Sequence, residues 1–123
     1  MAQHIKNTWN QLDLEISEEK DSIIIKWIGK SIGRDPSVFT APIMSDALED
    51  SISKGKKLEL DFRDLEFMNS STITPISKII DIAKKKNARV SVIYQKSRNW
   101  QELNFSALRI FETEDRRIEI IGV

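Results

Sequence analysis

The sequence predicts an α/β fold, with helices packed on a mixed, mainly parallel central sheet. Two observations lead to this prediction. Segments with apolar residues at every second position alternate along the chain with segments whose apolar residues recur every three or four positions. The resulting order of elements is β-β-α-β-α-β-α-β, and repeated strand–helix–strand crossovers require parallel strands covered by helices.

An antiparallel hairpin is predicted at the start of the domain, which makes the sheet mixed. Apolar and polar residues alternate over residues 12–16, with the two-residue period of a strand. A turn-prone stretch follows at residues 17–22, and a second strand occupies residues 23–28.

The first helix is predicted from Pro36 to just before Gly55. Asp35 suits an N-cap, and proline suits the first helical position. Apolar residues then recur at helical spacing, with Pro42 as an interruption. The loop before this helix, residues 29–33, has two glycines but lacks the residue order of a phosphate-binding loop.

A strand over residues 58–62 and the helix after it frame a run of hydroxyl side chains. Asn69 is of a type that favours helix N-caps, and apolar residues recur at helical spacing over residues 73–83. The hydroxyls at the start of this helix are Ser70, Ser71, Thr72 and Thr74. Free backbone N–H groups at a helix start attract anions, so a phosphate there could switch a binding surface.

Pro75 leaves two possible starts for this helix. If the helix begins near Ser70, Pro75 lies in its second turn and distorts it. If Thr74 caps the helix, Pro75 is its first residue and the other hydroxyls lie in a loop. We favour the start near Ser70.

Three further elements complete the chain: a strand at residues 90–94, a short helix at 100–110 and a strand at 118–121. We expect one domain over residues 12–123, because 123 residues suffice for a single core. Residues 1–11 are polar, and we expect them to form a loose N-terminal lead-in.

Composition excludes several classes of function. The 19 acidic and 19 basic side chains cancel, which argues against nucleic-acid binding driven by bulk charge. No apolar run approaches the roughly 20 residues of a membrane span, and no signal-peptide profile begins the chain, so we expect a cytoplasmic protein. With no cysteine and with His4 as the only histidine, we expect no metal site, cofactor or catalytic triad.

The segment at residues 58–71, L-E-L-D-F-R-D-L-E-F-M-N-S-S, resembles the turn that characterises the STAS domain family. That family includes bacterial anti-sigma factor antagonists. The stretches at residues 87–90 and 103–111 resemble later segments of the family, so the resemblance spans nearly the whole chain. It implies a STAS-like fold.

The resemblance also implies a non-catalytic switch. A partner kinase, often an anti-sigma factor, would phosphorylate Ser70, a phosphatase would reverse this, and the unmodified form would bind the partner. Ser71 and Thr72 are less favoured acceptors. The partner-binding residues would be Arg34, Asp35, Asn69, Ser70, Ser71, Thr72 and Thr74.

Two features depart from the family pattern, since Asn69 replaces an aspartate and Thr72 replaces a glycine. The sequence ends directly after its last predicted strand, so we also expect the helix that usually follows that strand in the family to be missing. An alternative therefore keeps the fold without phosphorylation: a scaffold, or an accessory subunit of a lipid-transport ATPase or sensory assembly. A third hypothesis is a small enzyme, in which Asp61, Asp64 or Glu66 would have to act as a general base toward Ser70.

Overall fold

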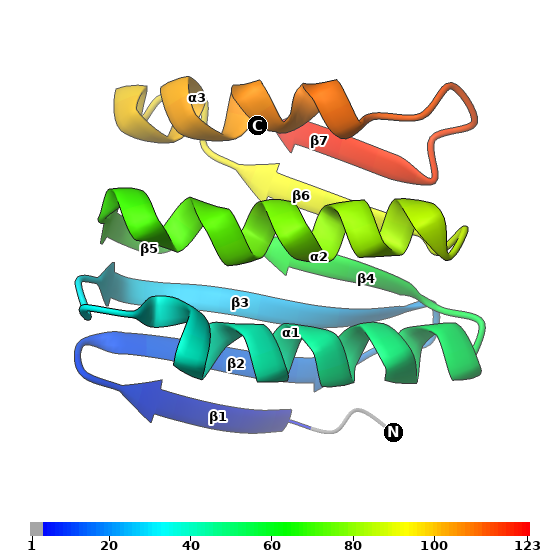
Figure 1. Ribbon diagram of the computed structural model, residues 1–123, viewed down its shortest axis with the longest axis horizontal. Helices are drawn as coiled ribbons and strands as arrows, with labels where there is room; N and C mark the ends of the chain where they lie inside the picture. Colours follow the sequence, from blue (N-terminus) through cyan, green and yellow to red (C-terminus); the bar gives the residue numbers. More distant parts are fainter. Residues whose placement is uncertain (1–3) are drawn as a thin grey trace.

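The computed structural model describes residues 4–123 and has two layers, one sheet and a row of helices on one of its faces (Figure 1). The strands are β1 (His4–Trp9), β2 (Leu12–Glu18), β3 (Ser22–Ser31), β4 (Lys57–Asp61), β5 (Leu65–Met68), β6 (Val90–Tyr94) and β7 (Ile118–Gly122). The helices are α1 (Pro36–Ser53), α2 (Ile73–Lys85) and α3 (Asn99–Phe105), with 3-10 helices η1 (Ser70–Thr72) and η2 (Ser106–Phe111). Within residues 4–123, no helix is long and apolar enough to cross a membrane.

The sheet has the strand order β1-β2-β3-β4-β6-β7, and β5 pairs with the end of β3. The pairings β1–β2 and β2–β3 are antiparallel, and the other pairings are parallel. The predicted fold class, a mixed and mainly parallel α/β sheet, is therefore confirmed. All eight predicted elements are present, and α1 continues through Pro42.

Two strands were not predicted. Residues 4–9 form β1, which corrects the expectation that residues 1–11 are a loose lead-in; residues 1–3 lie outside the described residues. β1 is a polar edge strand, and its register with β2 places only every second side chain on the helix-covered face. β5 has only four residues, too few for a clear alternating pattern.

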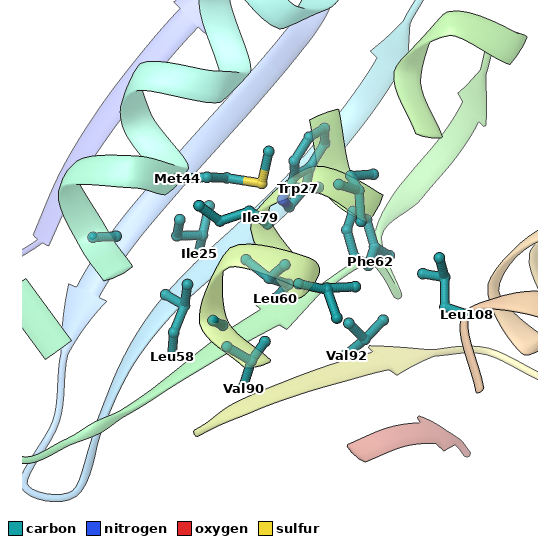
Figure 2. Packing of buried hydrophobic residues seen from close by; sticks show 14 of the residues in the cluster. Ile25, Trp27, Met44, Leu58, Leu60, Phe62, Ile79, Val90, Val92 and Leu108 are labelled. Carbon is teal, nitrogen blue, oxygen red and sulfur yellow. The ribbon is translucent and has the colours of Figure 1, made fainter. Parts of the chain in front are cut away.

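The core lies between the sheet and the helices. Every second residue of the strands points into it, such as Leu58 and Leu60 of β4, and both are fully buried (Figure 2). The ring of Phe62 packs between Trp27 and Phe105, with centroid distances of 4.9 and 4.4 Å. This packing fixes the helices against the sheet.

All three α-helices begin at the same edge of the sheet, on the left in Figure 1. This follows from the crossovers, because each helix starts after the carboxyl end of a parallel strand and returns across the sheet. The β3–α1 connection and the β5–η1 connection therefore lie at one edge, which is where ligands of α/β sheets usually bind.

Candidate functional site

The structure decides between the two possible starts of the second helix. A 3-10 turn over Ser70–Thr72 precedes α2, which begins at Ile73. The favoured start near Ser70, with a local distortion, is confirmed. Pro75 is the third residue of α2, where a backbone N–H would have no partner within the helix, so its missing donor costs little.

Asn69 ties the start of α2 to the end of β3. Its Oδ1 accepts hydrogen bonds from Ser71 Oγ (2.9 Å) and Thr72 Oγ1 (2.8 Å). Its Nδ2 donates to the carbonyl of Gly33 (2.9 Å), and its backbone N–H donates to the carbonyl of Ser31 (2.9 Å). The side chain must both accept and donate, which an aspartate carboxylate cannot do. The departure from the family pattern at this position thus has a local structural reason.

Thr72 belongs to this network and not to the surface. It is fully buried, and its Oγ1 lies 2.7 Å from Oγ of Ser31, which is also fully buried. This corrects the expectation that Thr72 is an alternative phosphate acceptor and a partner-binding residue, because neither a kinase nor a partner can reach a side chain without exposed area.

Ser70 is the most available hydroxyl of the run. It is exposed, and it takes part in none of the side-chain hydrogen bonds found within residues 4–123. Ser71 is also exposed, but its hydroxyl is engaged by Asn69. Ser70 therefore offers a free hydroxyl at the first helical residue.

A groove of about 550 Å³ lies between α1 and α2, beside this turn. We call it the helix groove. It brings together three of the predicted partner-binding residues, Asp35, Ser71 and Thr74, whereas Ser70 and Arg34 do not line it. The sequence did not reveal the other lining residues of this groove, among them the apolar side chains of Met44, Ile79 and Ile82 and the charged side chain of Lys78.

Exposed apolar side chains near Ser70 were also missed. Ile32 follows the last residue of β3 and is 43% exposed, and Phe67 lies in the paired strand β5 and is 49% exposed. Val38, in the first turn of α1, is 71% exposed. The sequence did contain a signal for this surface: Ile32 and Phe67 are large apolar residues that lie outside the predicted strands and helices. Ile32 and Phe67 lie at the paired ends of β3 and β5, and exposed apolar side chains that gather in this way are typical of a protein-binding surface.

Two of the three carboxylates proposed as general bases, Asp61 and Asp64, are held elsewhere; Glu66 is exposed in β5. Burial raises the pKa of Asp61, but hydrogen bonds from Arg63 outweigh it and leave that pKa below its usual value. Asp64 pairs with Lys26 at 3.1 Å, and Lys26 and Asp61 both line a hollow on the sheet face that the helices leave open. Within residues 4–123, no cluster of three metal-ligating side chains is present. The arrangement presents hydroxyls and apolar groups for binding and places neither Asp61 nor Asp64 beside Ser70.

Solved structures share this architecture over nearly the whole chain. SiaC of Pseudomonas aeruginosa superposes with a TM-score of 0.66 at 20% identity, over 98% of this chain and 99% of that chain. A chain in the complex of the diguanylate cyclase SiaD with its activator SiaC, from the same organism, gives 0.64 at 18% identity, over 97% and 99%. A DUF3478 protein from Shewanella loihica, described as having a SpoIIAA-like fold, gives 0.53 at 18% identity, over 97% and 90%.

No protein-family model and no curated protein matches the sequence. At these levels of identity the solved structures establish the fold. The chain has the SpoIIAA-like fold, which is the STAS-like fold that the sequence resemblance predicts.

Proposed function

We propose that the protein is a non-catalytic signalling protein that binds a protein partner at the start of α2 and releases it when Ser70 is phosphorylated. The observation that carries this proposal is the free, exposed Ser70 hydroxyl, which lies in the chain between the exposed Phe67 and Ser71, a residue that lines the helix groove. Arg34, Asp35, Ser71 and Thr74 complete the proposed surface.

Phosphorylation at this position has a direct physical effect on binding. A phosphate adds about −1.5 to −2 charges at pH 7. The helix N-terminus stabilises that charge within this protein. A partner that packs apolar groups against Phe67 and Ile32, or places a carboxylate near Ser70, loses affinity because it must desolvate or face the new charge.

Two kinds of partner follow from different observations. The resemblance to anti-sigma factor antagonists suggests a kinase that is itself an anti-sigma factor, with a phosphatase that resets the switch in the cytoplasm. The similarity to SiaC, which activates a diguanylate cyclase in the matched complex, suggests instead an enzyme whose activity the bound protein controls. The alternative without phosphorylation, a constitutive scaffold or accessory subunit, uses the same surface.

The test compares Ser70→Asp with Ser70→Ala in cells that express the protein naturally. We expect Ser70→Ala to retain a partner during affinity purification and Ser70→Asp to lose it. Ser97→Asp adds the same charge at an exposed serine in the β6–α3 connection and is the matched control. Phosphopeptide mapping of the wild-type protein under two growth conditions should find phosphate on Ser70.

Equal capture by Ser70→Asp and Ser70→Ala, together with an unmodified Ser70 under both conditions, would reject the switch and favour the constitutive scaffold. Turnover of a phosphoester that Ser70→Ala abolishes would instead establish an enzyme.

A further inference from the structure

A second groove lies on the other side of α1, between this helix and the outer strands β1 and β2. Its volume is about 770 Å³, and we call it the edge groove. Its floor is apolar and comes from the helix-covered face of the sheet and from α1: Ile5, Ile16, Ile23, Ile43 and Ala47. Ile5 is 53% exposed, and Ile16 and Ile43 are partly buried, whereas Ile23 and Ala47 are buried. The part of the floor that β1 supplies is therefore the part most open to solvent.

The edge groove exists because the sheet is wider than its helix layer. In Figure 1, α1 is the last helix toward the N-terminal side of the sheet, and β1 runs along the lower edge with no helix in front of it. The pairing of Ile5 with Ile16 places both side chains on the helix-covered face, beside α1. The groove thus has the position of one further helix in the layer.

The rim of the edge groove is acidic. Four carboxylates line it, those of Glu18, Asp46, Glu49 and Asp50, and none of the described lining residues is basic. Asp46 and Asp50 are four residues apart on α1, so they follow the groove along its length. A bound segment therefore meets an apolar floor and a row of negative charge.

Three lysines outside the groove, Lys54, Lys56 and Lys86, pair with three of these four carboxylates, but the pairs do not close the site. Lys54 lies 2.9 Å from Glu18 and 3.2 Å from Asp50, and Lys86 contacts Glu49. The Lys54–Asp50 and Lys86–Glu49 pairs are exposed and contribute little. Lys56 and Glu18, 2.7 Å apart, are only partly exposed, so Asp46, Glu49 and Asp50 are the rim carboxylates most available to a new cation. Asp46 has no ion pair within residues 4–123.

We infer that the edge groove binds an amphipathic α-helix of a partner protein, with an apolar stripe on the floor and basic side chains against the acidic rim. The partner helix would lie beside α1, at the usual distance of about 8–10 Å between helix axes, and would complete the helix layer. This inference goes beyond the proposed function, because the edge groove and the helix groove lie on opposite sides of α1 and share no lining residue.

The test uses a synthetic leucine–lysine amphipathic helix as long as α1, 18 residues, titrated into the full chain and followed by NMR of the backbone amides. We expect shift changes confined to β1, β2 and the Ile43–Ser53 side of α1. The same peptide with glutamate in place of lysine should not bind. The double variant Ile5→Lys, Asp46→Lys should weaken binding about tenfold or more, because it charges the floor and reverses one rim charge.

Leu103→Lys is the matched control, since it places the same charge at an apolar side chain that is 77% exposed on α3, and binding should be unchanged. Ser70→Asp should also leave peptide binding unchanged, so failure of the phosphorylation switch and failure of this inference are separate results. Ile5 is exposed and Asp46 lies on the surface, so the double variant should fold, and the shift map of the wild-type chain tests the site without any substitution.

Three outcomes would overturn the inference: shift changes centred on the helix groove or the open sheet face, equal binding of the glutamate peptide, or no binding. Sedimentation of the wild-type chain adds a fourth. Self-association that Ile5→Lys abolishes would mean that a second copy, and not a partner helix, covers the groove.

Discussion

Helix α1 separates two grooves that differ in whether a second helix of the chain lines them. The helix groove has a helix of the chain on each side, hydroxyl groups at its entrance and one charge of each sign, Asp35 and Lys78, on its walls. The edge groove has a helix on one side only and a rim of carboxylates. Ser71 and Thr74, at the start of α2, line the first groove, and residues of β1, β2 and α1 line the second.

If both proposals hold, this difference would let one small domain separate control by phosphorylation from attachment to a partner. A charge added at Ser70 acts on side chains around the helix groove and is screened within roughly 8–10 Å at physiological ionic strength. A partner helix in the edge groove would be held by contacts on the other side of α1. The protein could then remain attached to one partner while phosphorylation changes its binding of another.

The largest expected difference between the two sides of α1 concerns packing. Met44 lines the helix groove and is fully buried, whereas its neighbour Ile43 lines the edge groove and is only partly buried. Met44→Ala should lower the free energy of unfolding by about 2–5 kcal/mol, because it removes buried volume and leaves a cavity. Ile43→Ala should cost less, about 1 kcal/mol, since Ile43 is only partly buried and less of its surface leaves water on folding.

Urea unfolding of both variants measures these costs. A loss for Ile43→Ala that equals the loss for Met44→Ala would mean that the edge groove is closed in solution, for example by self-association. That result would remove the distinction between the two grooves.

A smaller difference is expected between two asparagines. Asn69→Asp should lower the free energy of unfolding by about 1–3 kcal/mol, because it removes the donor to the carbonyl of Gly33 and places a carboxylate against that oxygen. Asn7 lines the edge groove and takes part in none of the side-chain hydrogen bonds found within residues 4–123, so Asn7→Asp should cost much less. Denaturant unfolding at neutral pH checks both; similar costs would show that the Asn69 network does not stabilise the turn.

Sequence patterns predicted the elements whose faces differ clearly in polarity. Helix α2 shows this best, because its buried residues Ile76, Ile79, Ile80 and Ala83 recur at helical spacing. The same reasoning missed β1, whose polar composition reflects its place at the sheet edge, a tertiary fact that local periodicity does not contain. It also missed β5, which exists because its four residues pair with the end of β3.

The placement of the candidate site residues could be predicted in part, and their function stays a prediction. Chain order alone placed the hydroxyl run at a helix start, and Ser70 is indeed exposed there. The burial of Thr72 could not be predicted, since it depends on Ser31, a residue 41 positions earlier in the chain. The grooves were missed for a similar reason: each is lined by side chains from elements that are distant in the sequence.

The smallest expected effect is the pH dependence of the edge-groove rim. Hydrogen bonds from Lys54 and Lys56 lower the pKa of Glu18 from 4.5 to about 2. Because this pKa is lower in the folded state, the ionised Glu18 carboxylate stabilises the fold at pH values above 4.5. This stabilisation is lost as the pH falls from about 4.5 to about 2. Glu18→Gln should therefore be slightly less stable than the wild-type protein at neutral pH, and the difference should disappear near pH 2. Urea unfolding over this pH range measures the difference. A constant difference for Glu18→Gln would show that Lys54 and Lys56 do not hold this carboxylate in solution, and that this part of the rim is already free to receive a basic helix.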